Sequence, residues 1–158
     1  MLKLNVDGAF RDSDKNGEWG YVIRDECGEV IQSGSGRVSF AINPIQMELI
    51  ASIERVKAAI SLGVNNIILE TDAQQVVWAM QGDDFRLAVV GGLVHELKDL
   101  VVENFASFIV KYVPRDCNRV AHELASIGSR SHDLAPSCWP VANCIMILVS
   151  GYLADMVE

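Results

Sequence analysis

The spacing of apolar residues changes period twice along this chain, and that change sets the order of its secondary structure. Residues 2–10 alternate between apolar and polar side chains, which is typical of a strand with one buried face. Residues 19–24 and 30–39 read as two further strands. The segment 25–29 joins them as a hairpin in which Gly28 can take a positive φ. The first forty residues therefore predict three antiparallel strands.

A helical period replaces this alternation after residue 43. Asn43 suits the N-cap of a helix and Pro44 suits its first position. Apolar residues then recur at spacings of four, three and four, which marks one buried face: Leu49, Ile53, Val56 and Ile60. Gly63 is a suitable helix end. Residues 66–70 return to a short apolar run, as expected for a central parallel strand.

The rest of the chain predicts two helices, a strand and a last helix. Asp72 is a candidate cap for a helix that runs to Met80, and residues 87–102 read as the next helix. Residues 105–113 form a strand, and Asn118 is the expected cap of a helix through Ile127. This order predicts an α/β domain with a mixed sheet and helices packed on it.

Three acidic residues stand at the edges of different predicted elements: Asp7, Glu48 and Asp72. Taken singly, they read as a turn aspartate, a solvated helix residue and a helix cap. Taken together, they converge, because neighbouring strands would end in Asp7 and Asp72 and the first helix would bring Glu48 beside them. Clustered carboxylates bind hard divalent cations such as Mg²⁺, and two such ions can promote hydrolysis of a phosphodiester.

Other hydrolytic sites are poorly supported. A phosphatase of the haloacid dehalogenase type needs a second aspartate two residues after the first, and here Ala9 follows Asp7 and Gly8. The chain has no phosphate-binding glycine loop and no nucleophile elbow. His95 and His132 lie on polar segments without a partner at metal-ligand spacing, so we expect them at the surface.

Net charge, cysteine spacing and the apolar segments indicate which partners and which cellular compartment to expect. The net charge is −8, which opposes tight unaided binding to nucleic acid, although bound Mg²⁺ would supply local positive charge. The four cysteines have no zinc spacing and predict reduced thiols, with a disulfide between Cys138 and Cys144 as the alternative. The N-terminus has no apolar leader, and residues 141–153 are too short to span a bilayer. We therefore expect an intracellular protein, nuclear or cytoplasmic and not secreted, without membrane attachment.

These residues resemble the ribonuclease H family, type 1, and in particular the reverse-transcriptase-like domains of plant non-LTR retroelements. The resemblance covers roughly residues 2–130. It is carried by five blocks of sequence: Asn5-Val6-Asp7-Gly8-Ala9, Gly20 to Asp25 with Gly28, Met47-Glu48-Leu49, Glu70-Thr71-Asp72-Ala73-Gln74, and Val113-Pro114-Arg115 through Asn118 to Ala125. The first and last blocks together are the most specific.

The resemblance implies a ribonuclease H-like five-stranded mixed sheet of order 3-2-1-4-5 over residues 1–130, followed by an apolar extension, 131–158, packed on the domain or on a partner. It implies two-metal hydrolysis, with Mg²⁺ or Mn²⁺, of the RNA strand of an RNA–DNA hybrid. Asp7, Glu48 and Asp72 match the metal ligands. Gly8, Ala9, Asn43 and Gln74 match nucleic-acid contacts.

Two departures from the family pattern bear on activity. The fourth catalytic carboxylate is replaced by His122, and imidazole is a poor ligand for Mg²⁺. The loop with a mobile histidine and the basic substrate-gripping protrusion have no counterpart. The leading expectation is a hybrid-specific endonuclease weakened by His122, in which His122 orients water or carries a proton. The alternative is a catalytically impaired module that binds nucleic acid or an unknown protein partner.

Overall fold

The computed structural model describes residues 1–82, 89–128 and 137–140. The strands are β1 (Leu2–Arg11), β2 (Asn16–Arg24), β3 (Val30–Val38), β4 (Asn66–Thr71), β5 (Ser107–Tyr112) and β6 (Ser137–Pro140). The helices are α1 (Pro44–Ser61), α2 (Gln74–Gln81), α3 (Gly91–Asn104), the short 3₁₀ helix η1 (Arg115–Cys117) and α4 (Arg119–Gly128). The predicted order of elements is confirmed, with β6 as an addition.

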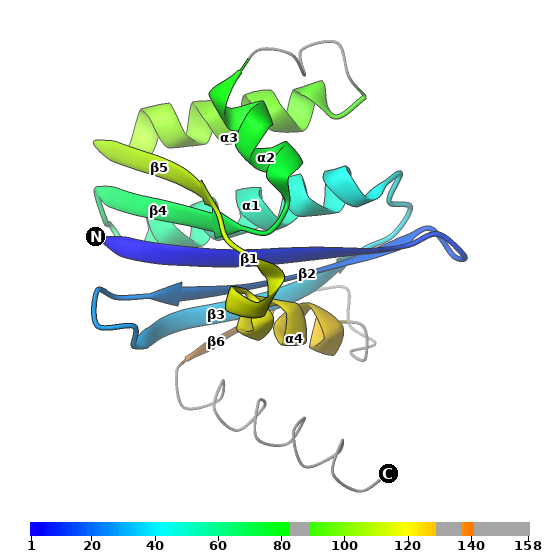
Figure 1. The fold of residues 1–158 in the computed structure, drawn as a ribbon, viewed down its shortest axis with the longest axis horizontal. Coiled ribbons are helices and arrows are strands. Elements are labelled where there is room, and N and C mark those ends of the chain that lie inside the picture. The colour runs from blue at the N-terminus through cyan, green and yellow to red at the C-terminus, as the bar shows by residue number, and fades with distance from the viewer. Residues whose placement is uncertain (83–88, 129–136, 141–158) are drawn as a thin grey trace, which may run out of the picture.

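One mixed sheet runs through the molecule in the order β5-β4-β1-β2-β3-β6 (Figure 1). β1 is antiparallel to β2 and parallel to β4, and β4 is parallel to β5. The predicted five-stranded order 3-2-1-4-5 is therefore confirmed. β6 pairs antiparallel with β3 and lengthens the sheet at that edge. This strand comes from the segment that the sequence predicted only as an apolar extension.

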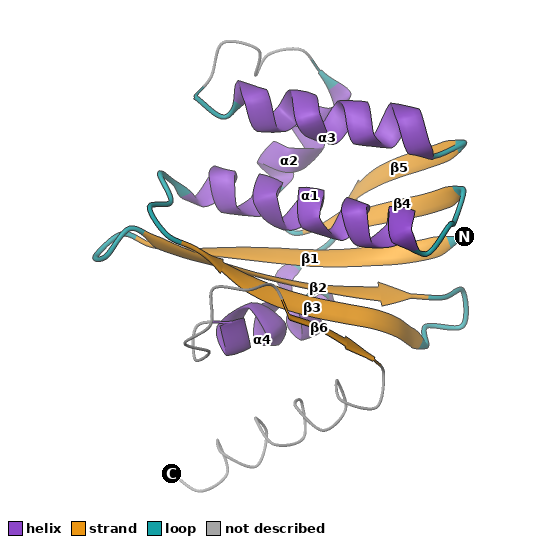
Figure 2. Cartoon of the chain, turned by 180° about the vertical axis from the view of Figure 1, so that it is seen from behind, coloured by secondary structure: helices purple, strands orange, loops and turns teal. Residues whose placement is uncertain are grey.

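Helices cover both faces of the sheet. α1 and α3 lie on one face, as Figure 2 shows, and α4 lies on the other. The core between α1, α3 and the sheet is continuous, and Leu4, Leu49, Ile67 and Leu97 within it have no exposed surface. Burial of such side chains contributes about 1.5–3 kcal/mol each. The strands are thereby fixed between two helical layers.

The predicted start and end of α1 and the predicted β2–β3 turn have the residues and backbone conformations that we expected there. The Asn43 side chain accepts a hydrogen bond from the Gln46 N–H at 2.9 Å and caps α1. Gly63, just after α1, has φ +67°, and Gly28 in the hairpin has φ +87°. Both values lie in the left-handed region that glycine takes without steric cost.

One predicted cap is wrong, and a second is confirmed only in its position. The N-cap of α2 is Ala73, whose N–H donates to Thr71 Oγ1 at 3.0 Å, so Asp72 does not cap that helix. Asn118 directly precedes α4 and its carbonyl oxygen accepts from the His122 N–H at 3.2 Å, but its side-chain nitrogen donates to groups outside that helix. The side chains of Asp72 and Asn118 thus bond to each other instead of capping helices.

Within the described ranges, no helix has the length and apolar character needed to cross a membrane. His95 is exposed, as expected, and Cys27 and Cys117 are free thiols. His132, Cys144 and residues 141–153 lie outside the described residues, as does the start of the helix expected from residue 87.

Candidate metal centre and active site

Asp7 and Asp72 lie side by side because β1 and β4 run parallel. The last pair in their register is Val6 with Thr71, and the next residue on each side is an aspartate. Asp7 is opposite Gly20 of β2, and Gly20 faces α4. Asp7 therefore lies on the α4 face of the sheet, where its side chain is almost fully buried.

Glu48 reaches the same place from α1. The first turn of α1 rests directly on β1, since a Cβ added to Gly8 would lie 2.5 Å from the Met47 carbonyl carbon. Only glycine permits this approach. The Gly8 N–H faces the Glu48 carboxylate and lowers its pKa, against the effect of burial. Gly8, which the sequence predicts as a nucleic-acid contact, thus also lets α1 place Glu48.

One carboxylate oxygen from each of Asp7, Glu48 and Asp72 lies within 4.8 Å of the other two. Burial raises the pKa of Glu48 well above its usual value, and the charges of Asp7 and Asp72 raise it further. Burial likewise raises the pKa of Asp7, with the Asp72 charge adding to the effect and a hydrogen bond from His122 opposing it. Both raised pKa values show that burial and mutual repulsion disfavour the ionised carboxylates.

The donor set fits a hard divalent cation. All three side chains offer oxygen, and Glu48 Oε2 is buried without a hydrogen-bond partner among the described residues. A buried, unpaired carboxylate oxygen is unfavourable unless a cation balances it. Asp7, Glu48 and Asp72 would hold such an ion between them, as their convergence in the sequence analysis predicted.

His122 joins this cluster from α4. Its Nδ1 lies 2.9 Å from Asp7 Oδ2, and its side chain is 37 % exposed. Arg115 Nη2 lies 3.4 Å from the same nitrogen. One nitrogen cannot donate to Asp7 and accept from Arg115 at once. The shorter contact to an acidic acceptor places the proton on Nδ1, and Arg115 then acts through its charge, which lowers the pKa of Asp7 and Glu48.

Asn118 is a site residue that the sequence analysis had placed only as a helix cap. Its Nδ2 donates to the Val6 carbonyl oxygen at 2.5 Å and to Asp72 Oδ1 at 3.3 Å. Both partners are acceptors, so the amide orientation is fixed. The side chain is 1 % exposed. Asn118 ties the start of α4 to both aspartate-bearing strands, and no spacing pattern in the sequence signals this contact.

The remaining predicted nucleic-acid contacts lie on the same elements as the carboxylates or next to them in the chain. Ala9 follows Gly8 on β1 and is half-buried, and Gln74 begins α2 two residues after Asp72. Asn43 lies at the start of α1, where its Oδ1 is engaged in the cap. Its Nδ2 would be the donor for a nucleic-acid contact.

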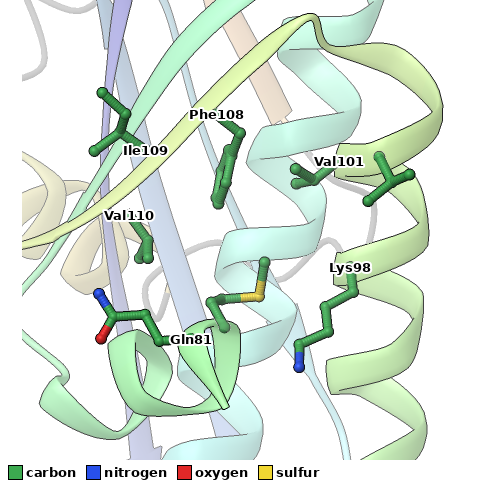
Figure 3. Close-up of a pocket in the computed structure, with 8 residues that line it drawn as sticks. Gln81, Lys98, Val101, Phe108, Ile109 and Val110 are labelled. Carbon is green, nitrogen blue, oxygen red and sulfur yellow. The ribbon is translucent and has the colours of Figure 1, made fainter. Parts of the chain in front are cut away.

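A groove of about 610 Å³ lies away from the carboxylates, between α2, α3 and β5 (Figure 3). Its lining is mainly apolar, with Phe108, Val110 and Val101 among the side chains shown. The polar side chains are Gln81 and Lys98, and Lys98 Nζ donates to the Gly82 carbonyl at 2.5 Å. Among the described residues that line this groove none is acidic, and none belongs to the candidate metal centre.

A model of the reverse transcriptase-like family matches residues 5–128, which include all four residues of the cluster. The chain belongs to this family. Comparison with curated proteins finds no match. The family assignment agrees with the resemblance drawn from the sequence blocks, whereas a plant origin is not shown by it.

Solved ribonucleases H share this family member's fold. Ribonuclease H1 from the archaeon Halobacterium salinarum has 24 % identity and a TM-score of 0.76, covering 82 % of this chain and 97 % of that one. An N-terminal ribonuclease H domain from Mycobacterium tuberculosis has 21 % identity and a TM-score of 0.75, covering 82 % and 93 %. LC11-RNase H1, solved with an RNA/DNA hybrid, has 19 % identity and a TM-score of 0.74, covering 80 % and 95 %. The chain therefore has the ribonuclease H fold.

Proposed function

We propose that this protein is a divalent-metal-dependent endonuclease that cleaves the RNA strand of RNA–DNA hybrids, with Mg²⁺ as its metal. The observation that carries the proposal is the convergence of Asp7, Glu48 and Asp72 within 4.8 Å on a ribonuclease H fold. The complex of LC11-RNase H1 with an RNA/DNA hybrid supports the choice of substrate by analogy of fold. A protein that only bound nucleic acid would gain nothing from three mutually repelling carboxylates.

Each residue of the cluster has a chemical task in this proposal. Asp7, Glu48 and Asp72 would hold the metal ions, whose chemistry would be to activate water and to stabilise charge on the leaving oxygen. His122 donates from Nδ1 to Asp7, and its partial exposure leaves the ring open to solvent, where it would orient water or carry a proton. Asn118 keeps Asp72 turned toward the cluster.

A catalytically impaired nucleic-acid-binding or protein-interaction module is the second candidate. The contact of His122 with Asp7 favours it, because that contact occupies Oδ2, an oxygen that would otherwise be available to a metal. Imidazole also replaces a hard oxygen ligand at this position. The net charge of −8 adds to the case against tight nucleic-acid binding.

Cleavage of a labelled RNA–DNA hybrid separates the two candidates. We expect the wild-type protein to cleave the RNA strand in Mg²⁺ or in Mn²⁺, and Asp7→Asn to lose at least 100-fold in rate with an unchanged circular dichroism spectrum. The control is Asp99→Asn, which alters an exposed carboxylate on α3. A folded wild-type protein that cleaves in neither metal would favour the binding module. Full activity of Asp7→Asn would rule out the metal-centre assignment.

A further inference from the structure

Phe40 is the most exposed large apolar side chain in the described part of the chain, with 85 % of its surface accessible. It also has φ +64°, a left-handed conformation that a bulky side chain rarely adopts. The ring gains nothing from packing, and the backbone is strained. Strain of this kind persists where the surrounding structure enforces it, and it concentrates at functional sites.

Several hydrogen bonds hold Phe40 in place relative to the metal centre. The Ala41 N–H donates to the Lys15 carbonyl oxygen at 2.7 Å, which ties the loop before α1 to the β1–β2 turn. Lys15 itself has φ +53°. The Ile42 N–H donates to Gln46 Oε1 at 2.5 Å, within the first turn of α1. Since α1 also carries Glu48, these bonds fix the backbone that presents Phe40 with respect to the helix of that carboxylate.

The β1–β2 register shows how far the end of this hairpin lies from the metal centre. Arg11, paired with Asn16, ends the hairpin ladder four residues beyond Asp7. Four residues of strand span about 13 Å. The turn to which the Phe40 loop is tied therefore lies at the end of β1, within reach of a nucleic-acid strand that continues past the metal centre.

The surroundings of Phe40 attract bases more than phosphates. The surrounding cations are balanced by anions: Arg11 pairs with Asp14 at 3.2 Å and with Glu18 at 2.9 Å, Lys15 pairs with Asp12, and Arg37 lies opposite Glu18 on the neighbouring strand. This balance leaves no net positive charge to hold a phosphate backbone. An exposed aromatic ring can stack on a base, but only where the base is unpaired, because a duplex hides its base faces.

Resting on the function proposed above, we propose that Phe40 stacks on an unpaired base that flanks the hybrid bound at the metal centre. The preferred substrate is then an RNA–DNA hybrid that adjoins a single-stranded segment, rather than a long uninterrupted hybrid. The aromatic contact replaces the basic grip that the acidic surface does not provide. Phe40 acts on substrate choice and leaves the chemistry at the carboxylates unchanged.

Binding measured in the non-cleaving Asp7→Asn background tests this proposal. The probes are a blunt RNA–DNA hybrid and the same hybrid with a single-stranded RNA extension. We expect Phe40→Ala to bind the extended hybrid at least fivefold more weakly, since a stacked base contributes about 1–3 kcal/mol. Binding to the blunt hybrid and the salt dependence of binding should not change. Phe40→Trp should keep the preference.

Controls separate a contact from a structural effect. Val102→Ala, at a side chain on α3 that is 80 % exposed, should leave both affinities unchanged. Phe40→Asn relieves the left-handed strain, so its melting temperature should hold or rise while its binding to the extended hybrid weakens. Unchanged binding by Phe40→Ala, or an equal loss of affinity for both probes, would overturn the proposal. Unchanged binding would indicate that the exposed ring contacts a protein partner instead. If the wild-type protein cleaves both hybrids and only the Phe40 effect is missing, the proposed function stands without this inference.

Discussion

At the scale of single residues, the carboxylate cluster is a source of instability that a metal ion would relieve. Glu48 and Asp7 both have raised pKa values, because burial and neighbouring negative charge disfavour their ionised forms. A group whose pKa is higher in the folded state binds more protons there than in the unfolded state. The metal-free protein should therefore lose stability as pH rises from the unfolded-state pKa of these groups toward their folded-state pKa.

Glu48→Gln isolates this effect, because glutamine resembles the protonated acid. We expect the unfolding free energy of Glu48→Gln minus that of the wild type to be near zero below about pH 4. At higher pH this difference in unfolding free energy should become positive. Its final size should be about 1.4 kcal/mol for each pKa unit by which folding raises the pKa of Glu48. Urea denaturation in a chelator at several pH values measures the difference. Glu103→Gln, at an exposed position of α3, is the matched control, and an equal pH trend in both variants would contradict the account.

The substitution of histidine for a carboxylate at position 122 gives a second prediction. His122→Asp replaces an imidazole, which is a poor ligand for Mg²⁺, with an oxygen donor beside Asp7. We expect several-fold faster Mg²⁺-supported cleavage and a lower melting temperature without metal, since a fourth negative charge joins the cluster. His95→Asp, on the exposed side of α3, controls for charge alone. A rate that stays the same or falls would show that His122 takes part in the reaction itself.

The four residues of this cluster were predictable from the sequence, whereas their supporting contacts were not. Asp7 and Asp72 follow strands whose apolar patterns are clear, so the parallel pairing brings them together. Asn118 was assigned to a helix end by its local propensity. Its bond to Asp72 joins residues 46 positions apart, and no local pattern reports such a contact.

At the scale of secondary-structure elements, the close approach of α4 to β2 places His122. A Cβ on Gly20 would lie 2.3 Å from the Ala125 nitrogen and 2.6 Å from the Ala121 carbonyl oxygen. These are backbone atoms, so the helix itself would have to move. Gly20 faces Asp7 across the β1–β2 pair, and its missing side chain lets α4 bring His122 to the aspartate.

Gly20→Ala should therefore destabilise the fold by about 2–3 kcal/mol and separate His122 from Asp7. Gly92→Ala on α3 is the matched control, because a Cβ there meets nothing within 4 Å. That change should be neutral or should stabilise the protein by up to about 1 kcal/mol through helix propensity. Thermal denaturation compares the two variants. A similar stability for both would contradict the packing described for α4.

Element order followed from periodicity alone, but two features of the sheet did not. Local patterns predicted the alternating strands and the apolar face of α1, because each element buries one side. β6 was not predicted, since its four residues carry no alternation long enough to read, and its pairing with β3 is a long-range contact. β3 and β6 are joined by backbone hydrogen bonds, and such bonds do not depend on the pattern of apolar and polar side chains.

At the scale of the whole molecule, the protein is acidic and its candidate metal centre consists of carboxylates. The net charge of −8 and the pairing of Arg11 and Lys15 with aspartates leave weak attraction for phosphates. Within the described structure, the cation that acts on the cluster is Arg115, which lowers the pKa of Asp7 and Glu48. Divalent metal would thus be a main source of positive charge where the substrate must bind.

The central claim is that Asp7, Glu48 and Asp72 form a divalent-metal site, and the melting temperature as a function of Mg²⁺ concentration tests it most directly. A ligand that binds only the folded protein raises its stability as its concentration increases. We predict that the wild-type melting temperature rises with Mg²⁺, whereas Glu48→Gln begins higher in chelator and responds little. A wild-type protein that shows no more response to Mg²⁺ than Glu48→Gln would contradict the assignment of the metal centre.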